Sequence, residues 1–563
     1  MKKRLIFFVV MLGFRPVLAI PTDSTAVSAE STAVKKPSVV VTGEIGLSTG
    51  FYSMTGLEPR AQFTPWSTSG KLTLQTTSGW TIPMTFVYSS QDNRFRQPYN
   101  QIGISALHKQ DFKLHLGYRN VYFSPFTLAG HLFLGVGAEV QAGKIRLGVV
   151  SGKLNRAIES DYADPDRIPT FKRTGYSVRI GVGSPTNYFD VIFLKAADDL
   201  LSIDAESAAQ RNVSAAENTV LGVSSRIKIA KKFTFELDGS ASAYSKDIRA
   251  EVVDNKYASS LRLLFVPRIN SQYFTAFQSA VGYQTKPFGI KLQYKRIEPD
   301  FRTMGAYYFQ QDIESFTVAP TFKLFKKKLT LKTSIGVQHD NLLNQKKVQT
   351  NRLIGSAAMV FAPNENFSID ALYSNYGITQ KAGYLPLIDT LRIAQNNRTL
   401  SLNGMYMRAG ETTNHTFMAT AIYQELQDLN QRTAALNENQ NWNYNASYSF
   451  QHLIANVDLS LSYSYTLTKA LDIETTYAGP SLSVAKRLLK EDRLSINTNL
   501  NYLRSHENIF GLEDQGHVLS TSLGIDFKIA SKHTFSFNWN YLQSQGVQDF
   551  TEHRGSVGYQ VSF

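Results

Sequence analysis

The chain has 563 residues, a formal net charge of +14 and no cysteine. Aromatic residues make up 12% of it and charged residues only 18%, which excludes a disordered chain, because disorder needs few aromatics and many charges. The lack of cysteine excludes a disulfide framework, a zinc-thiolate site, a thiol nucleophile and a lipoprotein anchor. No apolar run reaches the roughly 18 residues of a membrane-spanning helix, so the chain is not a polytopic helical membrane protein.

The first residues have the pattern of a secretory signal. Lys2–Arg4 form a positive region, Leu5–Phe14 is apolar, and Val17–Ala19 fits a cleavage site of small residues. The apolar part is too short to span a hydrocarbon core of about 30 Å, so it does not predict an anchor helix. We therefore expect a signal peptide at 1–19, followed by a small, polar, flexible linker at 20–37.

From residue 38 almost to the end, apolar and polar residues alternate, which is the pattern of strands with two different faces. A soluble β-sandwich also alternates, but its solvent face is usually rich in Lys and Glu. Here the polar face is Ser, Asn, Thr and Gly, as in 442–450 and 535–541. Ten-residue segments of this kind with aromatic ends are typical of transmembrane barrels. The sequence predicts an all-β fold, an antiparallel up-and-down β-barrel at 38–563, exported through the periplasm into the outer membrane of a Gram-negative cell.

Loop lengths allow the strands to be counted, because such barrels alternate short periplasmic turns with longer extracellular loops. Short turns are expected at sites such as Ala142–Lys144, Ala230–Lys232 and Lys326–Lys328, and long segments at others, including 505–517. The alternation holds if the apolar run Tyr257–Val266 belongs to a long loop rather than to a strand. The prediction is then about 26 strands, within a range of roughly 22–28, with both termini on the periplasmic side.

The last ten residues carry a further mark. Val557, Tyr559, Val561 and the terminal Phe563 fall on one face of the last expected strand. This pattern resembles the C-terminal signal of bacterial outer-membrane barrels, which ends in an aromatic residue. The resemblance implies recognition of these four residues by the barrel-assembly machinery, with outer-membrane lipid as the final surroundings.

A barrel of this size raises the question of what fills it. Barrels of 22 strands carry a plug, yet only residues 20–37 stand between the expected signal and the first strand, so the sequence does not predict a plug domain. Either loops fold into the lumen or a protein partner fills it. The candidate loops are 155–172, 198–219, 246–273 and 377–397. Of these, 246–273 is favoured because its apolar residues Leu261, Leu263, Leu264, Phe265 and Val266 require burial.

One stretch resembles known proteins more closely. Phe301–Phe309 (FRTMGAYYF) with Asp312, followed by Asp340-Asn341, Gln345–Lys347 and Thr350–Arg352, is similar to large porin-like outer-membrane barrels of Bacteroidota that lack a plug domain. Some barrels of that phylum serve secretion and gliding machineries. The resemblance implies a membrane role but does not fix the function.

No constellation for catalysis is found. The ten histidines are scattered, and none lies in a GxSxG or HExxH pattern. Asp161, Asp164 and Asp166 offer oxygen ligands but not the spacing of an EF-hand loop, and His506 and His517 near Glu507, Glu513 and Asp514 could hold a metal only if one loop gathers them. Solvated side chains explain both sets, and also Asp198, Asp199, Asp204 and Glu206. We expect no enzyme activity, no cofactor and no nucleic-acid partner.

Basic residues at inward positions are more informative. Arg226, Lys228, Lys291, Lys295 and Lys323 are expected to face the lumen, and Arg179 and Arg262 could join them. Such a lining favours anions, unless the cations pair with Asp and Glu across the lumen. The first functional hypothesis is a channel or porin-like protein that transports small polar solutes past inward-folded loops. The alternative is a non-conducting scaffold or a component of a secretion or surface-attachment complex.

Overall fold

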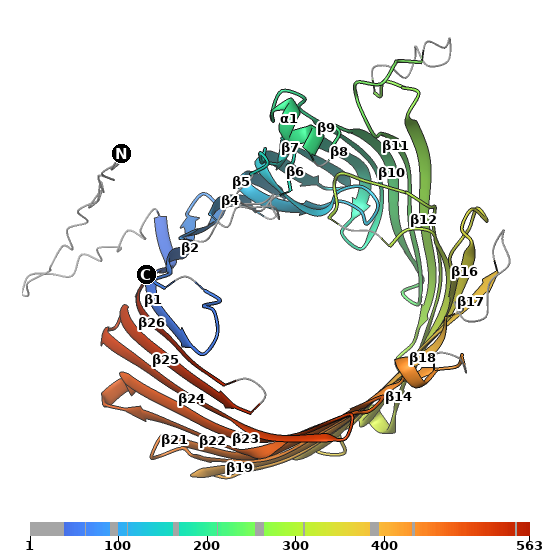
Figure 1. Cartoon of the computed structure of the whole chain (residues 1–563). Helices are drawn as coiled ribbons and strands as arrows, with labels where there is room; N and C mark the ends of the chain where they lie inside the picture. Colours follow the sequence, from blue (N-terminus) through green and yellow to red (C-terminus); the bar gives the residue numbers. More distant parts are fainter. Residues whose placement is uncertain are drawn as a thin grey trace, which may run out of the picture. The chain divides into compact units, whose positions relative to one another are not determined.

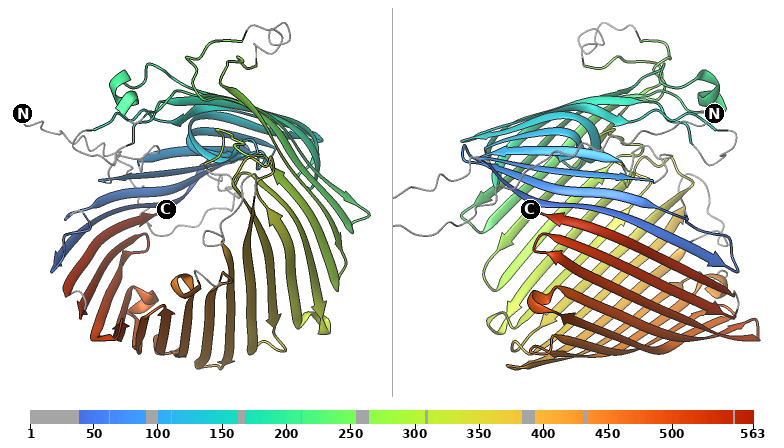
Figure 2. Two further views of the ribbon diagram at one scale, coloured as in Figure 1. Left: turned by 45° about the vertical axis from the view of Figure 1, so that its right-hand side comes forward. Right: turned by 90° about the vertical axis from the view of Figure 1, so that its left-hand side faces the viewer.

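The computed structural model describes residues 39–61, 63–90, 100–109, 111–161, 168–210, 212–253, 264–307, 310–382, 393–430, 434–546 and 549–563. The expected signal and linker lie outside these residues. The described chain forms a 26-stranded antiparallel sheet in which each strand pairs with its neighbours in sequence. Glu44 of β1 pairs with Ser562 of β26, so the first strand meets the last and the sheet closes into a barrel. Figure 1 looks into this barrel, and Figure 2 shows the tilt of its strands.

The strand bounds follow, in chain order. They are β1 (Val39–Thr55), β2 (Trp66–Thr76), β3 (Trp80–Ser89), β4 (Gln101–His108), β5 (Phe112–Tyr122), β6 (Ala129–Ala142), β7 (Ile145–Asn155), β8 (Arg173–Ser184), β9 (Asn187–Asp198), β10 (Glu217–Ile229), β11 (Phe233–Ser245), β12 (Ser271–Gln284), β13 (Phe288–Ile297), β14 (Ile313–Leu324), β15 (Leu329–His339), β16 (Val348–Phe361), β17 (Phe367–Ala382), β18 (Ala394–Ala409), β19 (Thr413–Asp428), β20 (Asn439–His452), β21 (Val457–Ala470), β22 (Ile473–Leu488), β23 (Leu494–Ile509), β24 (Leu512–Ala530), β25 (His533–Gln545) and β26 (Phe550–Ser562).

The two faces of the wall differ in the way that the alternation predicts. Along β10, Leu221, Ile227 and Ile229 are exposed on one face, whereas Val220 on the other face is fully buried. Side chains of a strand point alternately to opposite faces, so the apolar exposed set is the outward face. Closure leaves no unpaired edge, which is the requirement for a sheet that crosses a bilayer. The fold is that of an outer-membrane β-barrel.

Aromatic pairs lie on the outward face close to one end of the strands. Phe233 opposes Tyr283 across β11 and β12, with ring centroids 4.8 Å apart, and Phe288 opposes Phe322 across β13 and β14 at 5.2 Å. Cross-strand aromatic pairs stabilise a sheet. At the ends of membrane-spanning strands, aromatic rings also mark the level of the lipid headgroups.

The two ends of the barrel differ in their connections. Each even-numbered strand from β2 to β24 is joined to the next by two to five residues, and we call this end the short-turn end. The opposite loop end carries the long connections. β11 pairs directly with β12, so no strand of the described sheet lies between them, and the strand count of 26 is confirmed.

The prediction of a long loop at 505–517 is wrong. β23 and β24 continue into a hairpin whose turn is Phe510-Gly511, both with positive φ. A second short hairpin at the same end, with Leu471-Asp472 between β21 and β22, was not expected at all. Both hairpins arise because long strands stay paired beyond the region that alternates strictly, and their polar residues resemble loop residues in sequence.

Loops at the loop end pack on one another. Phe171, Ile203 and Ala208 form a buried cluster, in which Ala208 belongs to the short helix α1 (Ala205–Gln210). Lys172 binds Asp199 at 2.7 Å, and Ser160 donates to Ser207 at 2.9 Å. Among the described residues, the other short helices are η1 (Phe325–Lys327), α3 (Ala434–Asn437) and η3 (Lys490–Asp492). No helix among the described residues is long and apolar enough to cross a membrane.

Candidate functional site

Parts of three connections from the loop end pack against the inward face of the wall. In the connection between β1 and β2, the Arg60 N–H donates to the hydroxyl of buried Tyr52 at 3.2 Å, and the other two connections make the larger apolar clusters. We call 123–128, between β5 and β6, the first inward segment, and the described residues 298–307 and 310–312, between β13 and β14, the second. Phe126 and Phe301 meet edge to face at 6.1 Å within a buried cluster that includes Ile297, and Phe301 is fully buried. A second cluster joins the segments to the wall strands, and it contains Phe123, Leu128, Met304, Ile192, Leu194 and Val220. Apolar burial therefore holds both segments on the wall.

Hydrogen bonds fix the register of these segments. The Thr303 hydroxyl donates to the carbonyl of Thr127 at 2.8 Å, and the Ala129 N–H donates to the Gly305 carbonyl at 2.9 Å, so the two segments are tied together. Asn218 of β10 ties them to the wall, because its Oδ1 accepts from the Met304 N–H at 2.9 Å. The fully buried Asn218 also donates through Nδ2 to Ser242. The polar groups that folding inward would bury are thus satisfied.

Glycine allows the close approach of these segments to the wall. A Cβ on Gly305 would lie 2.5 Å from the carbonyl oxygen of Thr127 and from Leu194 Cδ1, too close for either. We expect Gly305→Ala to weaken docking of the second segment by about 1–3 kcal/mol, the usual result of overpacking. Faster hydrogen exchange at the Ala129 amide would report it. Gly404→Ala, where nothing lies within 4 Å, is the control and should exchange as the unmodified protein does.

The described part of the loop favoured from sequence, 246–253 with 264–273, does not supply inward cover. The Thr219 hydroxyl donates to the carbonyl of Leu264, and Arg268 lies 3.6 Å from Glu217. Thr219 and Glu217 share the face of exposed Leu221, opposite to Asn218. The described part of this loop therefore lies on the outward face at the loop end, and the expectation is wrong for this part of the loop. Leu261, Leu263 and Arg262 lie outside the described residues.

Asp312, at the end of the second inward segment, anchors it to the connection between β15 and β16. Its buried carboxylate accepts the backbone N–H groups of Asn341 and Leu342, each at 2.9 Å, and binds Lys346 Nζ at 2.5 Å. Burial acts to raise the pKa of Asp312, but the Lys346 ammonium and the two N–H groups outweigh it and hold this pKa below its ordinary value of 3.8.

This anchor predicts an acid-dependent change. A lowered folded-state pKa stabilises the folded segment above the ordinary value, and this stabilisation is lost as the pH falls through the folded pKa. We expect the protection of the Asn341 and Leu342 amides from hydrogen exchange to be constant from neutral pH to about pH 4 and to fall only below it. Asp312→Asn removes the titrating group, so this protection should differ at neutral pH and show no acid step. An acid step that survives in this variant would contradict the assignment.

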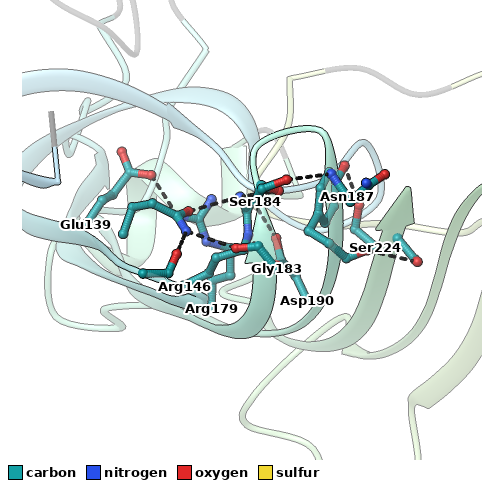
Figure 3. Close-up of polar contacts among 12 residues, drawn as sticks. Glu139, Arg146, Arg179, Gly183, Ser184, Asn187, Asp190 and Ser224 are labelled. Carbon is teal, nitrogen blue, oxygen red and sulfur yellow. Dashed lines mark hydrogen bonds and ion pairs between the residues drawn. The ribbon is translucent and has the colours of Figure 1, made fainter. Parts of the chain in front are cut away.

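Nearer the short-turn end, the same wall carries a belt of ion pairs (Figure 3). Arg146 binds both carboxylate oxygens of Asp190, at 2.8 and 2.9 Å, and Asp190 is 1% exposed. Glu139 accepts from Arg179 at 3.0 Å and is bonded to His115 at 3.0 Å. These side chains point inward from β5 to β9, where acids and bases neutralise one another at short range.

The sequence matches no family model and no curated protein. Among solved structures, it is similar to BauA, the ferric preacinetobactin receptor of Acinetobacter baumannii, at 11% identity over 92% of this chain and 80% of that one, with a TM-score of 0.38. It is also similar to the P pilus usher (PapC) translocation pore, at 10% identity over 93% of this chain and 99% of that one, with a TM-score of 0.36. The similarity to an outer membrane channel from Pseudomonas putida F1 is 14% identity over 42% of this chain and 85% of that one, with a TM-score of 0.23. The likeness is one of fold.

The basic residues expected in the lumen lie on the inward face, but they are not equivalent. Arg226 and Lys291 both bind Glu236, at 2.6 and 2.7 Å. Lys295 shares the inward face of β13 with buried Ile297, and Lys323 shares that of β14 with buried Ile313. Within the described part of the chain, no ion pair involves Lys228, Lys295 or Lys323. Their effect on solute choice stays a prediction.

The C-terminal residues complete the barrel seam. Val557, Tyr559 and Val561 face outward on β26, opposite Thr49, Leu47 and Ile45 of β1, and the Phe563 N–H donates to the Gly43 carbonyl at 2.9 Å. Recognition of these residues by an assembly machinery stays a prediction.

The side chains weighed as metal ligands in the sequence do not form a metal site among the described residues. His506 and His517 are strand residues that oppose Gln515 and Arg504, so no loop gathers them. Asp161 is described, whereas Asp164 and Asp166 are not. Among the described residues, no group of three or more His, Asp or Glu could hold a metal ion.

The remaining wall, from β20 to β25, is lined differently. Its inward residues are mostly Ser, Asn and Thr, which bond across strands, as from Asn443 to Thr466 at 2.8 Å and from Asn499 to Ser483 at 2.6 Å. None of the described loops packs there in the way that the inward segments pack on β5–β14. The lumen is therefore lined by two different surfaces, one charged and covered, the other polar and bare.

Sequence reasoning missed the inward segments and the belt residues Arg146, Asp190 and Glu139. A signal for the first was present in 188–194 (YFDVIFL), where consecutive apolar residues interrupt the alternation. A strand that is apolar on both faces is buried on both, so this run indicated an inner layer over β9. The belt left no comparable signal, because isolated charges at inward positions look alike whether paired or free.

Proposed function

We propose that this protein is an outer-membrane channel for small polar solutes, with a lumen narrowed on one side by the two inward segments. The observation that carries the proposal is the closed barrel wall, apolar outward and polar inward, with the docked segments on one arc alone. A lumen lined by Ser, Asn and Thr offers hydrogen bonds to passing solutes without holding them tightly.

A steady ion current is the direct test. Purified barrel in a planar bilayer should show one stable open level, and the current should persist when the lipid is changed. Silence from barrels whose folding is established by heat-dependent mobility on gels would refute an open channel. A current that appears only in unfolded preparations would refute it equally.

The proposed channel should prefer anions, because Lys228 and Lys323 add positive charge that no described acid neutralises. In a salt gradient the reversal potential should have the sign of anion selectivity. Lys228→Gln with Lys323→Gln should move it towards zero, since fixed charge in the lumen sets selectivity. Lys490→Gln, in the turn between β22 and β23, is the matched control. An unchanged potential in the double variant would remove these lysines from the mechanism.

A second candidate function is a scaffold or a component of a secretion or surface-attachment complex. The observation that favours it is the bare wall, because a barrel of this width needs closure and the inward segments cover one arc only. Such a protein should be silent when purified alone and should conduct or translocate only with its partner.

A further inference from the structure

The short-turn end is strongly basic along one arc. The turns before β11, β13 and β15 carry lysines and no acidic residue, and lysines on the adjacent inward faces continue the charge. We call this set the basic arc, and it comprises Lys228, Lys231, Lys232, Lys286, Lys323, Lys326, Lys327, Lys328 and Lys332. All but the half-buried Lys323 are exposed. In the part of the chain that the structure describes, none of them has an ion-pair partner, whereas Lys291 and Arg226 nearby share Glu236.

An apolar strip begins where the basic arc ends. On β16–β19, five large apolar side chains face the lumen and are 38–45% exposed, and we call them the apolar strip: Val360, Leu372, Met405, Met407 and Met418. Met405 directly opposes Met418, and Met407 follows two residues on. On the neighbouring bare wall, from β20 to β25, the inward residues are mostly Ser, Asn and Thr, so the strip is a local departure. Exposed apolar patches mark interaction sites, and Met-rich ones adapt to varied partners.

Register shows that the two surfaces are continuous. Lys332 of β15 directly opposes Ala358 of β16, two residues from Val360. Val360, Met407 and the lysine turns all lie within a few residues of the strand ends. The basic arc and the apolar strip therefore form one curved surface at the short-turn mouth of the lumen. Asp370, opposite Val360, is the inward acid within the strip.

We propose that this surface docks a protein partner through an amphipathic segment, whose acidic side chains meet the basic arc and whose apolar face covers the strip. Unpaired lysines beside exposed methionines are complementary to such a segment in charge and in hydrophobicity. Anionic lipid is the other class of ligand that lysines attract. Lys228, Lys323, Lys332 and the whole strip face the lumen rather than the bilayer, which favours a partner that enters the mouth.

The test measures binding of a labelled synthetic helix, with Leu on one face and Glu beside it, to the full barrel in nanodiscs of zwitterionic lipid. We expect saturable binding that weakens with salt, because exposed charges are screened. Lys326→Glu with Lys327→Glu and Lys328→Glu should weaken it by about tenfold or more and flatten the salt dependence. Met405→Ser with Met418→Ser should weaken it comparably without changing that dependence. Lys490→Glu, in the turn between β22 and β23 outside the basic arc, and Leu471→Ser, in a hairpin at the loop end, are the matched controls.

Three results would overturn the proposal. The first is that a control peptide binds the barrel as tightly as the designed helix does. The control peptides are one of the same composition in scrambled order and one in which every Glu is replaced by Lys. The second concerns lipid. If the unmodified barrel retains anionic lipid, and the triple lysine variant loses this lipid but binds the peptide unchanged, the basic arc is a lipid site. The third is a photo-cross-link from position 405 to residues 20–37 of the same chain. The assay needs no ion current, so a silent barrel would count against the channel and leave this test intact.

Discussion

Replacing Phe301 with alanine should release the second inward segment from the wall and raise the single-channel conductance. Phe301 is fully buried among Phe126, Ile297 and Ile313, and truncation of a buried Phe to Ala costs about 3–5 kcal/mol. The strand ladder does not depend on this side chain, so we expect the loss to fall on docking of the segment rather than on the barrel. Conductance and hydrogen exchange at the Met304 amide measure the two consequences.

The control for this change is Phe325→Ala, in the turn before β15, where the ring is 70% exposed. It removes the same atoms from a site with little burial and should leave conductance and exchange unchanged. Equal conductance of the two variants would show that the second segment does not limit the current. Slow exchange in Phe301→Ala would show that hydrogen bonds through Asn218 and Thr303 suffice for docking.

The barrel is predictable from the sequence because apolar and polar residues alternate regularly along its strands. Strict alternation such as that of 457–465 encodes a wall with two faces, and closure follows from the need to satisfy every strand edge within a bilayer. The strand number required one further step, the phase of short and long connections, and it succeeded at Tyr257–Val266. It failed locally at Phe510-Gly511, because strands that extend past the membrane gain polar residues and look like loops.

The inner surface was less predictable, because it depends on contacts between residues far apart in sequence. Nothing in the pattern of 123–128 or 298–312 alone indicates that Thr127 meets Thr303. The stretch FRTMGAYYF resembles other outer-membrane barrels, but the resemblance does not say where in the barrel these residues lie. The sequence favours loop 246–273 as the inward loop because of its apolar residues. However, apolar residues of a loop can be buried against the outer face of the wall as readily as within the lumen.

Removing Arg146 alone should destabilise the barrel strongly, whereas removing Arg146 and Asp190 together should not. Asp190 is 1% exposed and Arg146 supplies both of its charge-assisted bonds, so Arg146→Met leaves a buried carboxylate without its cation. Breaking such a pair costs about 3–5 kcal/mol, while replacing both partners by apolar residues is often neutral. Urea unfolding in micelles should give a much lower free energy of unfolding for Arg146→Met than for Arg146→Met with Asp190→Leu.

The control is Arg249→Met, whose exposed pair with Asp247 lies in a loop. It should change the free energy of unfolding by less than about 1 kcal/mol. If the double variant is as unstable as the single one, the belt contributes through shape and packing rather than through charge.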